Sequence, residues 1–245
     1  MGAQLRLTVV MTSFNEIKNV EKAFESAKAI QVEDKEIIVM DNCSTDGTRE
    51  LLQSYEKKEP NIEFVLKEHN YDWPHSYLLG LKMAKGRYTY IHHADNEYDY
   101  SEVHKMLEYA EKNDLDILIC SRTKNFKGTR WELIKKRPEY LASIISTFLV
   151  NKWYGKNFTD IIGTQLLKTE SIKKIPTTMA HHGFIFEFIS RIAKSGLKMD
   201  EMAIGYTPRE CKADKKIKWY NMSDALVALF KERYFSDKNI KIWKL

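Results

Sequence analysis

Disulfide bonds are not expected to stabilise this chain, because its three cysteines, Cys43, Cys120 and Cys211, are odd in number and widely spaced. Such a set fits neither a disulfide framework nor a zinc site, and it favours a reducing compartment. Glycine and proline are scarce, with 10 and 5 residues among 245. With 43% apolar and 30% charged residues, the composition excludes a fibrous or disordered chain and predicts one globular domain.

Long apolar runs are also missing. The uncharged run from Tyr140 to Val150 is far shorter than the roughly 20 residues that a membrane-spanning helix needs. No apolar stretch followed by small residues occurs between Met1 and Thr8, so we expect no secretory signal. We therefore expect a cytoplasmic protein that touches a membrane, if at all, at its inner face.

Several enzyme classes lack their signatures here. The sequence contains no G-x-G-x-x-G, no G-x-x-x-x-G-K-[ST], no G-x-S-x-G and no H-E-x-x-H. These motifs are typical of dehydrogenases, P-loop enzymes, α/β-hydrolases and zinc proteases. Their absence argues against those four kinds of chemistry.

Positive charge is concentrated near the C-terminus. The segment from Lys212 to Leu245 has nine basic and four acidic residues, which equals the whole net charge of +5. The lysines of Lys215–Tyr220 and the apolar stripe Met222–Phe230 could rest on an anionic bilayer. Alternatively, the stripe packs on the core and the lysines are solvated. No nucleic-acid-binding fold is evident, so no nucleic acid is expected as a partner.

Short apolar runs alternate with amphipathic stretches in the first half of the chain. Strands are predicted at Leu5–Met11, Glu36–Met40, Ile62–Leu66, Tyr88–His92 and Ile117–Cys120. The stretches between them have helical spacing. This alternation predicts an α/β fold with a mostly parallel sheet and helices on both faces. In such sheets, ligands bind beyond the carboxyl ends of the strands.

The alternation weakens after Cys120. We expect a loop at Lys124–Arg137, helices at Glu139–Trp153 and Gly183–Ala193, and extended segments at Thr159–Leu167 and Leu197–Tyr206. No repeat and no linker marks a domain boundary.

The segment His93–Glu97 follows a predicted strand and contains three potential metal ligands. If it is extended, His93, Asp95 and Glu97 share one face and can converge on one cation. The carboxylates suit Mg²⁺ or Mn²⁺, and the imidazole favours Mn²⁺. Alternatively, Asp95 or Asn96 caps the following helix. His92 points away from Asp95 and is expected in the core.

Asp41 ends a predicted strand and is followed by the polar residues Asn42 and Ser44. Its carboxylate could accept hydrogen bonds from a base or ribose, or it could be structural. Asp46 is better explained as the cap of the next helix.

Taken in order, these segments resemble family 2 glycosyltransferases of the GT-A fold, in particular the dolichyl- and polyprenyl-phosphate glycosyltransferases. Thr12–Glu16 resembles the first nucleotide-contacting loop of that family, and Glu36–Thr48 resembles its second strand and turn. Ala84–Glu97 resembles the strand that leads into its metal-binding motif. The resemblance implies a single GT-A domain, with residues 1–120 as the nucleotide-sugar half and residues 121–245 as the acceptor half.

The resemblance also implies roles for individual residues. Nucleotide contacts are expected from Thr12, Phe14, Asn15, Glu16, Asp41, Asn42, Ser44 and Ala94. Asp95 would hold Mn²⁺ or Mg²⁺ between the two phosphates, with His93 and Glu97 as further ligands. Arg209 and Lys215 would close over the diphosphate. The acceptor side would include Ser121, Arg122, Lys135 and Glu187.

Some positions depart from the family pattern. His93 stands where the family has the first Asp of Asp-x-Asp, and Glu97 stands where the polyprenyl branch often has Gln. The stretch Asp160–Leu167 lacks the family's Ser-Gly-Phe. These departures bear on the metal ligands and on the acceptor.

The resemblance implies an inverting hexosyltransferase that moves a sugar from a UDP- or GDP-linked donor to a polyprenyl phosphate. One alternative is the extension of a surface glycan, for which Asp160 is the candidate base that takes the hydroxyl proton. Another alternative is a protein that binds nucleotide sugar without turnover.

Overall fold

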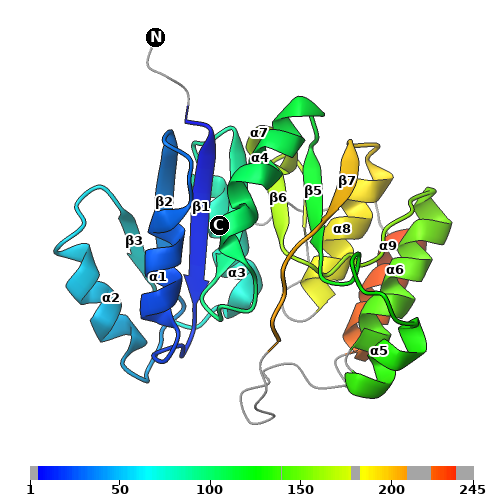
Figure 1. Ribbon diagram of the computed structural model, residues 1–245, viewed down its shortest axis with the longest axis horizontal. Coiled ribbons are helices and arrows are strands. Elements are labelled where there is room, and N and C mark those ends of the chain that lie inside the picture. Colours follow the sequence, from blue (N-terminus) through cyan, green and yellow to red (C-terminus); the bar gives the residue numbers. More distant parts are fainter. Residues whose placement is uncertain (1–4, 139, 178–182, 209–221, 236–245) are drawn as a thin grey trace.

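Seven strands of the computed structural model form one sheet within the described residues, in the order β3-β2-β1-β4-β6-β5-β7 (Figure 1). The structure describes residues 5–138, 140–177, 183–208 and 222–235. The strands are β1 Leu7–Ser13, β2 Lys35–Asp41, β3 Glu63–Leu66, β4 Tyr88–His93, β5 Ile117–Ser121, β6 Gln165–Lys168 and β7 Met199–Ala203. All pairs are parallel except those of β6, which runs antiparallel to β4 and β5. The predicted α/β fold is therefore confirmed.

Helices cover both faces of this sheet, as predicted. They are α1 Val20–Ala29, α2 Thr48–Glu56, α3 Asp72–Met83, α4 Val103–Lys112, α5 Arg130–Lys136, α6 Tyr140–Tyr154, α7 Thr169–Ile172, α8 Phe184–Lys194 and α9 Met222–Phe235, with a 3₁₀ turn, η1, at Tyr100–Glu102. One buried cluster joins the sheet to α1, α2 and α4, and another joins it to α3, α6, α8 and α9. Figure 1 shows α1 and α3 on opposite sides of the sheet.

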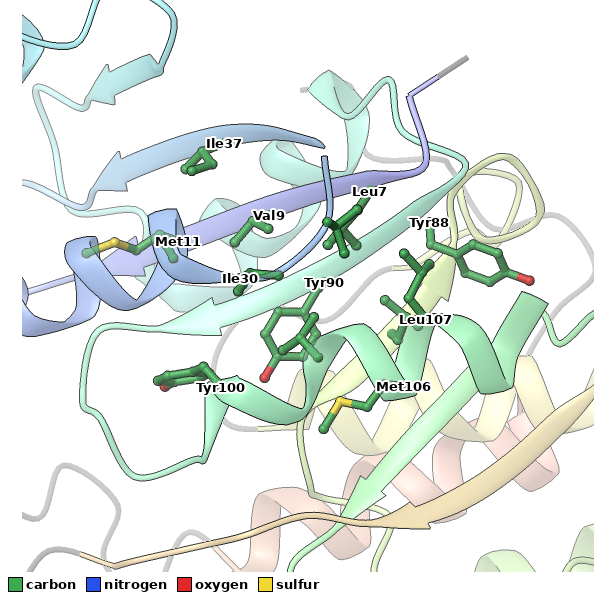
Figure 2. Packing of buried hydrophobic residues seen from close by; sticks show 14 of the residues in the cluster. Leu7, Val9, Met11, Ile30, Ile37, Tyr88, Tyr90, Tyr100, Met106 and Leu107 are labelled. Carbon is green, nitrogen blue, oxygen red and sulfur yellow. The ribbon is translucent and has the colours of Figure 1, made fainter. Parts of the chain in front are cut away.

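The central strand β1 packs against both layers. Its side chains alternate, so that Leu7, Val9 and Met11 enter one cluster and Val10 enters the other. Figure 2 shows the first cluster, in which Tyr90 and Met106 join these residues. All residues of β1 are buried, which explains its unbroken apolar and β-branched sequence.

The expectation of a loop at Lys124–Arg137 is wrong in part, because the segment contains α5. Thr129 caps this helix, and its hydroxyl accepts a hydrogen bond from the Glu132 backbone N–H at 3.2 Å. The Glu132 carboxylate accepts a hydrogen bond from the Thr129 backbone N–H at 2.8 Å. This reciprocal capping box satisfies two backbone donors at the helix start.

The last described helix, α9, packs on the core through Ala225, Ala228 and Leu229. This supports the core-packing interpretation of the apolar stripe, while the lysines of Lys215–Tyr220 lie outside the described residues. Within the described ranges, no helix combines the length and the apolar character that crossing a bilayer requires.

A buried ionic network fastens α9 to α8. The Arg191 guanidinium lies 2.9 Å from a carboxylate oxygen of Glu187 and 2.9 Å from one of Glu232. It also donates a hydrogen bond to the backbone oxygen of Pro176 at 2.7 Å. The three charged side chains are 3–7% exposed. Removing one partner of such a network leaves a charge buried without compensation.

We predict that Glu232→Ala lowers the free energy of unfolding by about 3–5 kcal/mol, because Arg191 loses one of its two carboxylates. Urea denaturation followed by circular dichroism measures this change. The matched control is Glu25→Ala, whose side chain is 61% exposed beside Lys28, and it should cost less than about 1 kcal/mol. Equal losses in the two variants would contradict the prediction.

Candidate functional site

The loops that follow β1 and β2 are joined by hydrogen bonds at the carboxyl edge of the sheet. The Asn15 backbone N–H donates to the Ser44 hydroxyl at 2.9 Å, and the Asn15 side-chain oxygen accepts from the Thr45 backbone N–H at 2.9 Å. The Glu16 backbone N–H donates to the Thr48 hydroxyl, also at 2.9 Å. These hydrogen bonds join the two separate segments into one unit at the edge of the sheet.

Asp41 is the last residue of β2, directly before the second of these loops, and it is 0% exposed. Its Oδ2 accepts hydrogen bonds from the Ser44 backbone N–H at 3.0 Å and from Arg49 Nη1 at 3.3 Å. Its Oδ1 is buried and has no hydrogen-bond partner among the described residues. A buried carboxylate oxygen without a donor is costly, so this atom is suited to accept a hydrogen bond from a ligand.

Lys67, which the sequence did not indicate, lies directly beyond β3 and beside this carboxylate. Its Nζ is 2.8 Å from His75 Nδ1, 2.7 Å from the Ser76 hydroxyl and 3.4 Å from the Asn42 side-chain oxygen. Burial lowers the pKa of Lys67 to about 8, although the charge of Asp41 opposes the shift. A lysine and a histidine eight residues apart form no recognised motif, so only the folded chain shows this cluster.

The segment after β4 turns instead of continuing as a strand. The Ala94 backbone N–H donates to the Thr12 carbonyl at 3.1 Å, and the Glu97 backbone N–H donates to Asp95 Oδ1 at 3.2 Å. Asn96 has a positive φ of 56°, a conformation that Asn tolerates. The alternation of an extended strand is therefore lost after His93.

Around this turn, two of the three expected metal ligands have other partners. The Glu97 carboxylate accepts a hydrogen bond from the Tyr206 hydroxyl at 2.7 Å, and the His93 ring packs against Trp73 with ring centres 5.7 Å apart. Among the described residues, no three His, Cys, Asp or Glu side chains are grouped so as to hold a metal ion. The expected convergence of His93, Asp95 and Glu97 is thus wrong.

The residues next to this turn cap the following helix and fill the core. Neither Asp95 nor Asn96 caps the following helix, because Asp99 does so by accepting from the Ser101 backbone N–H at 3.0 Å. His92 is buried in the core, as expected, with Nε2 2.8 Å from the Ala23 carbonyl. Burial lowers the pKa of His92 to about 3.

A divalent cation nevertheless fits the donor set that remains. Mg²⁺ is commonly bound through one or two carboxylates together with the phosphates of a substrate. Asp95 is a half-buried carboxylate on the turn after β4, next to the joined loops after β1 and β2. It would hold the cation, and the phosphates of a ligand would supply further oxygens.

On the other side of this edge, Asp160 forms a buried ion pair with Arg122. Arg122 Nε donates to Asp160 Oδ2 at 2.6 Å, and Nη2 donates to Oδ1 at 3.0 Å. The Ser143 hydroxyl also donates to Oδ1, at 2.6 Å. Burial raises the pKa of Asp160, but the Arg122 charge and these hydrogen bonds lower it more, so the net pKa is below its usual value.

Asp160 is therefore unsuited to the role of general base. It is 0% exposed, its charge is compensated by Arg122, and its lowered pKa reduces its affinity for a proton. The expectation that Asp160 takes the proton of an acceptor hydroxyl is corrected: this carboxylate positions Arg122.

Arg122 links the loop after β5 to the turn after β4. Its guanidinium lies 5.1 Å from the centre of the Tyr140 ring and 5.5 Å from that of the Tyr206 ring. Tyr206 in turn donates to Glu97, so one chain of contacts runs from the turn after β4 to Asp160. Within the described part of the chain, Nη1 of Arg122 makes no hydrogen bond, so it can bind an anion.

The remaining predicted residues are dispersed. Ser121 Oγ lies 2.7 Å from Thr159 Oγ1 and shapes the same loop as Arg122. Lys135 is exposed on α5, and Glu187 belongs to the buried network with Arg191, away from solvent. Burial and this ion pair leave Glu187 unsuited to bind an acceptor. Arg209 and Lys215 lie outside the described residues.

Comparisons with known proteins give a consistent picture. The family model for glycosyl transferase family 2 matches residues 8–175. A low-salt glycan biosynthesis hexosyltransferase of Haloferax volcanii is 26% identical over 85% of this chain and 49% of its own length. A dolichyl-phosphate beta-glucosyltransferase of Dictyostelium discoideum is 26% identical over 82% of this chain and 66% of its own length. The chain therefore spans about half to two thirds of these relatives.

Solved structures share the fold at low sequence identity. Staphylococcus aureus TarS in complex with UDP-GlcNAc superimposes with a TM-score of 0.65 and 16% identity, over 93% of this chain and 66% of that one. A mannosyltransferase of Pyrobaculum calidifontis, in complex with GDP-Man and Mn²⁺, has a TM-score of 0.60 and 14% identity, over 85% and 59% of the two chains. The likeness supports the GT-A fold that the sequence predicted.

The buried pair of Arg122 and Asp160 predicts a pH-dependent stability. The folded state lowers the pKa of Asp160 below its value in the unfolded chain, which is about 4. The ion pair therefore contributes its full stabilisation of the folded state above about pH 4, and this stabilisation is lost as pH falls through the folded pKa. Asp160→Asn should lower the free energy of unfolding by about 3–5 kcal/mol at pH 7. Below about pH 4, this difference in the free energy of unfolding between Asp160→Asn and the original chain should become smaller.

Urea denaturation over a pH series measures this deficit. The control is Asp34→Asn, an exposed residue just before β2, which should differ from the original chain by less than about 0.5 kcal/mol throughout. A deficit for Asp160→Asn that stays constant down to pH 2 would show that the ion pair is not its cause.

Asp95 is expected to couple metal and nucleotide binding. In the original chain, Mn²⁺ together with UDP or GDP should raise the melting temperature more than nucleotide alone. Asp95→Ala should abolish this metal-dependent increment, and Asp34→Ala should retain it. An unchanged increment in Asp95→Ala would contradict the assignment of Asp95.

Proposed function

The chain belongs to glycosyl transferase family 2, and from this premise we propose that it transfers a sugar from a UDP- or GDP-linked donor to a polyprenyl phosphate. The observation that carries the proposal is the position of Arg122, a cation held by Asp160 at the carboxyl edge that also bears Asp41 and Asp95. A donor diphosphate and an anionic acceptor can meet at this edge.

Residues 1–120 form the nucleotide half of the proposed site. The unpartnered Oδ1 of Asp41 accepts an N–H of the base or a hydroxyl of the ribose. The joined loops, with Thr12, Phe14, Asn15, Glu16, Asn42, Ser44 and Ala94, line the nucleotide. Lys67 and Arg49 add positive charge beside Asp41. This proposal leaves uracil and guanine as candidate bases.

Asp95 would hold Mn²⁺ or Mg²⁺ against the diphosphate. When bound, the cation neutralises the charge that develops on the departing nucleotide diphosphate. The mannosyltransferase from Pyrobaculum calidifontis, crystallised with GDP-Man and Mn²⁺, supports a metal in this role.

The acceptor half is built around Arg122. Its Nη1 would bind a phosphate oxygen of the acceptor, while Nε and Nη2 remain on Asp160. A phosphate oxygen is already anionic, so it attacks the anomeric carbon without a general base, and the bond to the nucleotide diphosphate breaks with inversion. The corrected role of Asp160, which is not available as a base, favours this acceptor.

The Dictyostelium discoideum relative, named a dolichyl-phosphate beta-glucosyltransferase, supports a lipid phosphate as acceptor. A second candidate function is the extension of a glycan. It is favoured by the Haloferax volcanii relative, which is named for glycan biosynthesis. In that case the acceptor is a sugar hydroxyl, and a base other than Asp160 must take its proton.

The decisive experiment offers a panel of labelled UDP- and GDP-sugars with Mn²⁺ and either a short polyprenyl phosphate or a soluble glycan. We expect transfer to the polyprenyl phosphate and none to the glycan. Transfer to the glycan alone would support the second candidate. Binding of a nucleotide sugar without transfer or hydrolysis would instead identify a binding protein, and it would contradict both proposals.

A further inference from the structure

The chain between Arg122 and Tyr140 makes an excursion beside the acceptor half of the proposed site. Its two ends meet, because the Arg122 guanidinium lies 5.1 Å from the centre of the Tyr140 ring. The Thr123 hydroxyl also donates to the Thr159 carbonyl at 3.2 Å. Figure 1 shows α5, which lies within this excursion, at the lower right below α6. The excursion is therefore attached to the sheet at Arg122.

Aromatic rings on this excursion are exposed to solvent. Trp131 is 64% exposed and Phe126 is 38% exposed. Neither ring belongs to the two buried core clusters, and burying their exposed area against a partner would be favourable.

Cations surround these rings without acidic partners. Lys127, Arg130 and Lys135 are exposed, and none of them pairs with a carboxylate among the residues that the structure describes. The acidic residue of α5, Glu132, accepts the backbone N–H of Thr129 in the capping box. The Glu132 carboxylate is therefore bound at the start of α5 and does not pair with these cations.

The geometry of α5 places a ring and a cation together. Trp131 and Lys135 are four residues apart and therefore lie on one face of the helix. Leu133, two residues beyond Trp131, lies on the opposite side of the helix and is half-buried. The outward side of α5 and the loop before it is accordingly aromatic and basic. We call the set Phe126, Lys127, Arg130, Trp131 and Lys135 the α5 surface.

We propose that the α5 surface docks on an anionic lipid bilayer. Tryptophan is favoured at the level of the lipid head groups, and lysine and arginine beside it are attracted by anionic lipids. An acidic protein would also match these rings and cations, and we choose the bilayer because the α5 surface lies beside Arg122, where a lipid-borne phosphate is proposed to bind. The inference rests on the proposed function for its purpose: docking here brings a lipid-borne phosphate to Arg122. Docking itself requires neither nucleotide nor transfer.

A second exposed apolar group allows a matched control. Tyr234 and Phe235 at the end of α9 are 61% and 79% exposed. Tyr234 is nearly as exposed as Trp131, and Phe235 is more exposed than Phe126, but both lie on another element. Serine substitutions of the two pairs remove comparable aromatic area.

Co-sedimentation of the full chain with vesicles tests the proposal. The vesicles consist of phosphatidylcholine, with or without phosphatidylglycerol, and no nucleotide is present. We expect binding only with phosphatidylglycerol, and weaker binding at high salt. The triple variant Lys127→Gln, Arg130→Gln and Lys135→Gln should bind about 100-fold more weakly, since each cation contributes roughly fivefold.

The aromatic variants locate the docking surface. Phe126→Ser with Trp131→Ser should lose vesicle binding, and Tyr234→Ser with Phe235→Ser should keep it. Loss in the α9 pair alone, equal binding to both lipid compositions, or no binding of the original chain would each overturn the proposal. Circular dichroism and the nucleotide-dependent melting shift confirm that the variants remain folded.

A second measurement does not depend on removing the surface. Brominated phosphatidylglycerol quenches indole fluorescence at the membrane interface, so quenching should fall in Trp131→Phe and persist in Trp153→Phe. The reverse result would place the membrane at α6 and α9. Vesicle binding without sugar transfer would leave this inference standing while the proposed function fails, and transfer without vesicle binding would do the opposite.

Discussion

The parallel register of β1 with β2 and β4 is the constraint on which the site depends. It pairs Ser13 with Asp41 and Thr12 with His93, so that the loops after three strands begin at one edge of the sheet. The register is maintained because both faces of β1 are buried, and a slip by one residue would exchange the two sets of side chains. Burial of an apolar strand thus determines where the polar residues meet.

Buried charge has a structural role in the described second half of the chain, as two ion-paired groups show. Asp160 orients Arg122 next to the site, and Glu187 and Glu232 hold Arg191 between α8 and α9. In both places the carboxylates are removed from solvent, and the ion pair offsets the cost of desolvation. Carboxylates that resemble acceptor-side or catalytic residues in the sequence are therefore explained by the packing of helices and loops.

The contact from Glu97 through Tyr206 to Arg122 links the turn after β4 to the loop after β5, where the acceptor is proposed to bind. It joins residues from the turn after β4, the segment after β7 and the loop after β5. Since Arg122 also lies against Tyr140, the excursion that bears α5 is attached to the same set of contacts. A molecule bound at the α5 surface would lie close to the proposed acceptor site for this reason.

The sequence by itself determined the alternation of strands and helices and the parallel sheet in the first half of the chain, because these follow from local periodicity. It also determined that the candidate site lies at the carboxyl edge of the sheet, because polar residues follow the strand ends. Through motifs in the order of the family that it resembles, the sequence also predicted Asp41, Asp95 and Arg122 as site residues. Only the tertiary structure decided that the chain turns after His93, so that Glu97 reaches Tyr206 and not a shared metal site. Only it showed Lys67 beside Asp41 and Asp160 against Arg122. The reason is physical: a side chain's partner depends on which segments pack together, and no local pattern records contacts between residues 25 to 109 positions apart.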